Sequence, residues 1–155
     1  MNIKKVLAYQ VLDSRGRPTV AVNLTLSDGS MHTARVPSGA STGAHEAHEL
    51  RDAGGSRAES FYGGKSVFAA VANVNEIIAP KLIGHSLNPA AIDGILVEVD
   101  PTPGHQRIGA NATLATSLAV AKASAHASGK SLARFYQPTG PLLIPMPMVN
   151  ILSGG

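Results

Sequence analysis

The first third of the chain alternates between apolar and polar residues with a period of two. Over residues 19–26 every second side chain is Val or Leu, which is typical of a strand with one buried face. The pair Asp28-Gly29 follows as a hairpin turn signal, and extended patterning resumes over 31–36. A partner strand is predicted upstream over 3–12. We therefore expect a three-stranded antiparallel meander.

Further along the chain the apolar spacing becomes helical. The Val, Ile and Leu residues of 67–82 recur every three or four positions, with Ser66 placed to cap the helix. Pro80 is expected to interrupt this helix in its last turn, because proline lacks the amide that the helix needs. A second helix is predicted over 88–99, where an Asn-Pro pair marks its start.

A third predicted helix is rich in alanine. Asn111 is expected to cap it and Gly129 to end it, and its small side chains would let it pack closely on the sheet. A short helical turn over 132–136 completes the set. Strands come first and helices afterwards, so the predicted fold class is α+β, a three-stranded meander followed by a helical layer.

The tail, residues 141–155, is almost wholly apolar and ends in Ser-Gly-Gly. A continuous apolar run of this kind predicts a strand buried on both faces, as in parallel sheets covered by helices. Nothing after Gly155 could supply those neighbours, so the chain is expected to be incomplete.

The segment 37–43 consists only of Pro, Ser, Gly, Ala and Thr. Such residues cannot anchor themselves by burial, but they offer hydroxyl and carbonyl oxygens, the ligand type that Mg²⁺ prefers. Gly39 and Gly43 flank a hydroxyl pair, which is a weak indication of a hinged lid. On composition alone an ordinary flexible surface loop is favoured.

Two familiar motifs fail on spacing. Residues 45–49 resemble a zinc-protease motif, but the second histidine would have to stand at position 49, which is Glu. Residues 62–66 resemble the end of a phosphate-binding loop, but Glu59 occupies the place of its first glycine. Neither a zinc site nor nucleotide binding is predicted.

Composition narrows the function class. The 155 residues are 44% hydrophobic, enough for one compact domain. The net charge of +3 is scattered, which argues against a nucleic-acid partner. The absence of cysteine fits a reducing cytoplasm, and no apolar run is long enough for a membrane span. The residues themselves predict an α+β domain with a hydroxyl-rich loop and reveal no reaction.

Five segments in the same order resemble the enolase (phosphopyruvate hydratase) family. They are 11–20, 36–52, 64–80, 109–123 and 145–151. The resemblance implies a capping domain over 1–139, then a linker and the first strand of a truncated TIM-type barrel over 140–155. It implies a cytoplasmic, Mg²⁺-dependent glycolytic lyase as the parent, one that interconverts 2-phosphoglycerate and phosphoenolpyruvate. The family base and acid lie in the barrel, so we expect no catalytic residue in this chain and no activity from it alone.

The resemblance also implies a site. Its mobile lid would consist of Ser38, Gly39, Ala40, Ser41, Thr42 and Gly43. The hydroxyl and backbone carbonyl of Ser41 resemble the family's ligands that close over the second, substrate-bridging Mg²⁺.

Departures from the family pattern identify a divergent member. Enolases often carry Arg where this chain has Tyr9 and Glu where it has Ala21, and these charges pair across the dimer interface. A homo-oligomer is still expected, but with this ion pair replaced. The same departures motivate an alternative, a non-catalytic enolase-like paralogue that acts as a binding protein.

Overall fold

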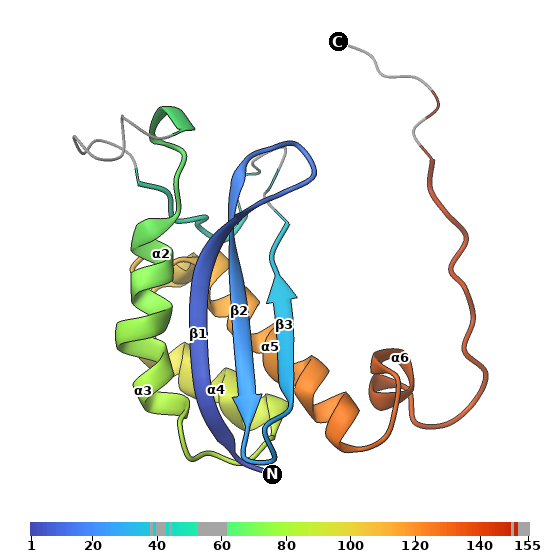
Figure 1. Ribbon diagram of the computed structural model, residues 1–155. Coiled ribbons are helices and arrows are strands. Elements are labelled where there is room, and N and C mark those ends of the chain that lie inside the picture. The colour runs from blue at the N-terminus through green and yellow to red at the C-terminus, as the bar shows by residue number, and fades with distance from the viewer. Residues whose placement is uncertain (38, 40–42, 44, 53–61, 150, 152–155) are drawn as a thin grey trace.

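The molecule is a small antiparallel sheet with a layer of helices on one of its faces (Figure 1). The computed structural model describes residues 1–37, 39, 43, 45–52, 62–149 and 151. The strands are β1 (Ile3–Leu12), β2 (Pro18–Leu26) and β3 (Met31–Arg35), in the order β1-β2-β3. The predicted meander and the predicted α+β class are confirmed.

The alternation along β2 determines which face of the sheet the helices cover. Val20, Val22, Leu24 and Leu26 are fully buried in the core. The turn into β3 forms as predicted, because the Asp28 carboxylate accepts hydrogen bonds from the amide and hydroxyl of the residue two positions on. The sheet register follows from this tight connection and from the buried face.

The first predicted helix is present as three consecutive elements. These are α2 (Phe68–Ala72), the π-helix η2 (Asn73–Ile78) and α3 (Ala79–Leu82). The regular α-helical form is interrupted by the π turn, one turn earlier than predicted, and the chain stays helical through Pro80 to Leu82. The wider π turn immediately before it accommodates the proline, which can neither donate an amide bond nor fit beneath a regular preceding turn.

Ser66 does not cap this helix, which corrects a second prediction. The residue at the cap position is Val67, and its side chain makes no capping bond. Instead the Asp52 carboxylate accepts from the amides of Phe68 and Ala69, at 2.7 and 2.9 Å. The cap comes from sixteen positions away in the chain, so a local pattern could not reveal it.

The remaining helices are α4 (Pro89–Val99), α5 (Ala110–Ala127) and α6 (Leu132–Tyr136), with single 3-10 turns at Tyr62–Gly64 and Pro103–His105. Asn88 caps α4 as predicted, accepting from the amide of Ala91 at 3.2 Å. The predicted cap of α5 is wrong: Gly109 occupies that position, and Asn111 lies inside the first turn.

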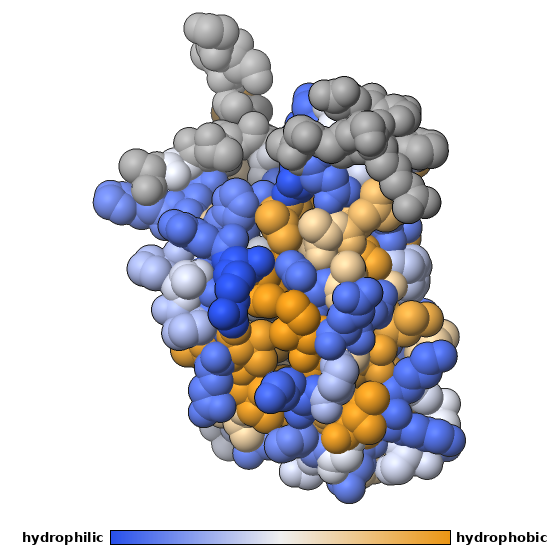
Figure 2. Space-filling model, turned by 90° about the vertical axis from the view of Figure 1, so that its left-hand side faces the viewer, coloured by the Kyte–Doolittle hydropathy of each residue, from blue (hydrophilic) through white to orange (hydrophobic). Residues whose placement is uncertain are grey.

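α5 is the central element of the helical layer. It packs across β2 and β3, and its buried face consists largely of alanine, which permits the close approach that the composition predicted (Figure 1). Figure 2 shows the face over α2 and α3, where apolar side chains gather among polar ones. Phe68 and Ile77 are among the exposed apolar residues of this helical segment. No helix in the described part of the chain is both long and apolar enough to cross a membrane.

The tail extends away from the rest of the molecule (Figure 1). Residues 141–149 have no regular secondary structure, and Ile144, Met146 and Met148 are each more than 90% exposed. The predicted strand is not formed over these residues, because a strand requires a paired neighbour and none of the described residues provides one. The assignment of 140–155 to a barrel stays a prediction.

Candidate functional site

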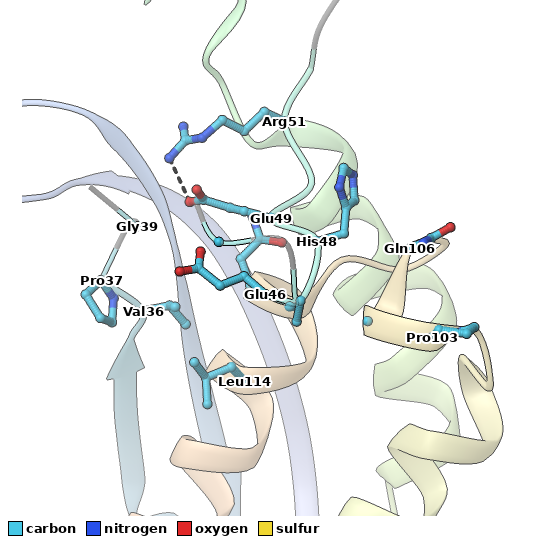
Figure 3. A pocket seen from close by; sticks show the side chains of 15 residues that line it. Val36, Pro37, Gly39, Glu46, His48, Glu49, Arg51, Pro103, Gln106 and Leu114 are labelled. Carbon is cyan, nitrogen blue, oxygen red and sulfur yellow. Dashed lines mark hydrogen bonds and ion pairs between the residues drawn. The ribbon is translucent and has the colours of Figure 1, made fainter. Parts of the chain in front are cut away.

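A pocket of about 820 Å³ lies where β3 ends, beside the segment 45–52 and the start of α5 (Figure 3). Val36 and Pro37 form one wall, and Leu114 of α5 contributes to the apolar floor. The carboxylates of Glu46 and Glu49 lie on the pocket side of the segment (Figure 3). The pocket therefore combines an apolar floor with an acidic rim.

The segment 45–52 has no regular secondary structure, yet its backbone is held at alternate residues. The His48 amide donates to the Gly104 carbonyl at 2.7 Å, and the His48 carbonyl accepts from the Ala110 amide at 2.8 Å. The Leu50 amide donates to Asn111 Oδ1 at 3.2 Å, while Asn111 Nδ2 donates to the Leu50 carbonyl at 3.0 Å. These bonds replace the strand pairing that an isolated segment lacks.

The third alternate residue is Asp52. Its amide donates to the carbonyl of Ser66 at 2.9 Å, and its carboxylate caps α2 as described above. The segment is thus connected to α5 at one end and to α2 at the other, so its side chains have a defined place beside the pocket.

Gly109 is needed for this arrangement. Its φ is +96°, a conformation that glycine adopts without strain. A Cβ at this position would lie 2.6 Å from both Leu50 Cβ and Asn111 Oδ1. The backbone of the segment and the start of α5 can therefore approach each other only because residue 109 has no side chain.

Asp100 holds together the loop 100–108, whose Gly104 carbonyl accepts the hydrogen bond from the segment 45–52. It is 1% exposed, and its carboxylate accepts from the amides of Thr102, Arg107 and Ile108 at 3.1, 3.0 and 2.7 Å. The Thr102 hydroxyl also donates to it. Burial alone would raise the pKa of Asp100, but these hydrogen bonds prevail and lower it to about 2. The loop that carries Gly104 is therefore built around a buried charge.

Arg51 connects the segment to two further parts of the chain. Its guanidinium donates to the carbonyls of Pro18 and Lys65, and it forms an ion pair with Glu49 at 2.7 Å. Within the described residues Glu46 forms no such ion pair. The two carboxylates at the pocket thus have different surroundings, one neutralised by Arg51 and the other not.

The predicted lid residues are only partly within the described structure. Gly39 and Gly43 line the pocket. Ser38, Ala40, Ser41 and Thr42 lie outside the described residues, so the predicted roles of the loop and of Ser41 are not tested.

The polar clamp, which we define as Asp100, Gly109 and Asn111, was not predicted as part of the site. Residues 109–111 belong to a segment that resembles the family, and the sequence predicts Asn111 only as a helix cap. A Gly-X-Asn start to a helix was the only signal in the sequence, and it does not say which backbone the asparagine contacts.

The described residues do not form a magnesium site by themselves. No group of three His, Asp or Glu side chains among them is placed to hold a metal ion. Glu46 and Glu49 are hard oxygen donors of the type that Mg²⁺ accepts, but two carboxylates, one of them engaged by Arg51, do not complete a coordination shell. A magnesium ion at this pocket would need further ligands from water, substrate or other residues.

Tyr9 and Ala21, the two positions where the resemblance leads us to expect dimer charges, lie opposite each other in the sheet. Tyr9 on β1 pairs with Ala21 on β2, on the face turned away from the helices. The Tyr9 hydroxyl donates to Asn23 Oδ1 at 3.1 Å, which gives it a partner within the chain, and Ala21 is fully buried.

Comparison with known proteins shows which family and which proteins this chain is similar to. Residues 3–136 match the family described as "Enolase, N-terminal domain". The chain is 49% identical over 154 residues to the enolase of Mesomycoplasma hyopneumoniae strain J, covering 99% of this chain and 34% of that protein. It is also 49% identical over 154 residues to the enolase of Campylobacter jejuni strain 81-176, covering 99% of this chain and 36% of the relative. The chain thus spans about a third of the length of the curated relatives it matches.

Proposed function

Because the chain belongs to the enolase family, we propose that it is the N-terminal part of a phosphopyruvate hydratase, a lyase that interconverts 2-phosphoglycerate and phosphoenolpyruvate in glycolysis. The observation that carries this proposal is the 49% identity over 99% of the chain, which includes the pocket-lining residues of the segment 45–52. The parent is proposed to be cytoplasmic and homo-oligomeric, with Mg²⁺ as its cofactor.

The role proposed for this chain is that of a lid at the edge of the active site. The loop 38–43 would close over the substrate and exclude water, and Ser41 would contribute its hydroxyl and carbonyl oxygens to the second Mg²⁺. When bound, the ion would supply positive charge for the negative charge that develops as a proton leaves beside a carboxylate. The segment 45–52 supports this role, because it follows the loop directly and its backbone is tied to α5.

The role of Ser41 is testable in the full-length parent protein. Ser41→Ala is expected to raise the Mg²⁺ concentration needed for half-maximal turnover and to lower the maximal rate, while the circular dichroism spectrum stays unchanged. Ser38→Ala is the matched control, since it also removes a serine hydroxyl from this loop, at a position that is not assigned as a ligand. Equal Mg²⁺ dependence in the wild type and Ser41→Ala would remove Ser41 from the mechanism.

The 155-residue chain by itself is proposed to be inactive, because the family base and acid are expected elsewhere. The purified chain should therefore form no phosphoenolpyruvate from 2-phosphoglycerate at saturating Mg²⁺, whereas the parent should. Detectable turnover by the purified chain would contradict this part of the proposal.

The second candidate is a non-catalytic enolase-like binding protein. It is favoured by Tyr9 and Ala21, which stand where the family usually has charged residues. The two residues are paired across β1 and β2, and the Tyr9 hydroxyl donates to Asn23 within the same chain. The two candidates differ in the barrel that is expected to follow. An intact set of barrel carboxylates and lysines, together with turnover, supports the enzyme, and their absence supports the binding protein.

A further inference from the structure

We infer that Asn111 is a positioning residue for the proposed site, because its carboxamide holds the backbone of the segment that follows the loop 38–43. The inference rests on the proposed function, since it concerns how the same site is kept in place. Asn111 lines the pocket itself, and its two hydrogen bonds to Leu50 go to the backbone of that residue. It would act through the segment 45–52, whose Glu46 and Glu49 line the pocket.

The first argument is the geometry of the contact. Asn111 is 3% exposed and makes two hydrogen bonds to one residue, accepting from the Leu50 amide and donating to the Leu50 carbonyl. Both bonds bridge 61 positions of the sequence. A carboxamide that pairs with both backbone groups of one residue fixes that residue in position and in orientation.

The second argument is that the element carrying Asn111 is itself immobilised. Ala112 and Ala115, in the same helix, are fully buried in the hydrophobic core. The start of α5 is therefore fixed relative to the core, and its hydrogen bonds fix the Leu50 backbone in turn. Gly109, where a Cβ would meet Leu50 at 2.6 Å, shows independently that the two backbones are held in close approach.

The third argument concerns the pocket. Bonds to the backbone of His48, Leu50 and Asp52 leave the intervening residues to form the pocket wall. Loss of the central bonds would release Glu49 and Arg51 from a fixed position while leaving both of these side chains in the chain. Supporting contacts of this kind decide how accurately a site is held.

The chain offers a matched control. Asn75 makes the same pair of hydrogen bonds to the backbone of a different residue, accepting from the Ala8 amide at 2.7 Å and donating to the Ala8 carbonyl at 3.1 Å. It connects η2 to β1 and does not line the pocket. Asn111→Ala and Asn75→Ala therefore remove the same bonds, and only the first removes them beside the site.

The first measurement uses amide hydrogen exchange in the 155-residue chain. Asn111→Ala is expected to speed exchange at the His48 and Asp52 amides, whose own acceptors are untouched, whereas Asn75→Ala should leave both unchanged. Unchanged exchange at His48 and Asp52 in Asn111→Ala would overturn the anchoring role.

The second measurement uses turnover of the full-length parent. Asn111→Ala is expected to raise the Mg²⁺ concentration for half-maximal rate by about tenfold, the size typical of lost supporting contacts, and Asn75→Ala should leave it unchanged. Asn111→Asp tests the donated bond separately, because it keeps an acceptor for the Leu50 amide but turns an oxygen instead of a donor towards the Leu50 carbonyl. It should also raise this Mg²⁺ concentration, because the Leu50 carbonyl loses its donor.

Equal effects of Asn111→Ala and Asn75→Ala on the Mg²⁺ dependence would overturn the positioning role. A wild-type parent without turnover would instead overturn the proposed function and, with it, the catalytic part of this inference. The exchange measurement would then still decide whether Asn111 anchors the segment.

Discussion

The apolar core beneath the sheet and the polar clamp beside the pocket hold the same chain by different forces. In the core, Leu24 and Ile78 are fully buried and contribute by leaving water, a force that depends on area and not on direction. In the clamp, Asn111 and Asp100 hold named backbone atoms through directional hydrogen bonds. The core accordingly supplies most of the stability, and the clamp determines where the pocket wall lies.

The core should be the more sensitive region to truncation. Leu24→Ala, in the centre of β2, is expected to lower the free energy of unfolding by about 3 kcal/mol, because it removes buried methyl groups and leaves a cavity. Urea unfolding followed by circular dichroism measures this change. Leu12→Ala is the control, since that leucine is 52% exposed and its truncation should cost little. Similar losses in the two variants would contradict a core centred on β2.

Breaking the clamp at its buried charge should have the next largest effect. Asp100→Ala is expected to lower the free energy of unfolding by about 2 to 3 kcal/mol, since three amides and one hydroxyl lose a charged acceptor. The exposed Asp93 of α4 is the control, and Asp93→Ala should change stability by less than about 0.5 kcal/mol. A loss in Asp100→Ala no larger than in the control would show that the loop does not depend on this carboxylate.

The same residue makes the clamp sensitive to acid. The pKa of Asp100 is lowered from 3.8 to about 2 in the folded chain, so its contribution is complete above pH 4 and is lost as the pH falls towards 2. This loss amounts to about 2 kcal/mol in the wild type. Asp100→Asn cannot ionise, so its stability should fall less over this interval. Parallel pH profiles in urea unfolding experiments would contradict the assignment.

The smallest predicted effect on stability distinguishes Asp52, the observed cap of α2, from Ser66, the cap that the sequence predicts. Asp52→Ala should lower the free energy of unfolding by about 1 kcal/mol, because the first amides of α2 lose their acceptor. Ser66→Ala should be neutral or slightly stabilising, since among the described residues the buried Ser66 hydroxyl has no hydrogen-bond partner. Thermal unfolding of the two variants tests the comparison, and a larger loss in Ser66→Ala would restore the local cap.

Much of the fold was predictable from local patterns. The alternation in 19–26 and the turn at Asp28-Gly29 predicted the meander, and Asn88 was correctly assigned as the cap of α4. The π-helix before Pro80 was not predictable, because the period of the apolar residues hardly changes when a single turn widens. The cap of α2 was missed for a different reason, since Asp52 is remote in sequence from the amides it caps.

The site was only partly predictable. The composition of 37–43 indicated a loop rich in oxygen ligands, and its two described glycines do line the pocket. The clamp, by contrast, brings together residues of two distant segments, and neither segment contains a motif that names its partner. Asn111 was expected at the cap of α5, a role suggested by its residue type and its place near the helix start.

For residues 3–136 the sequence by itself determined which stretches form strands and helices and which faces they bury, because these follow from periodicity and turn chemistry within a few residues. Only the tertiary structure decided which side chain caps α2 and which backbone Asn111 holds. Each of these bonds joins positions 16 or 61 apart, and the atoms meet only after the sheet and α5 have packed. Directional contacts between distant segments depend on the whole fold, so no local pattern specifies them.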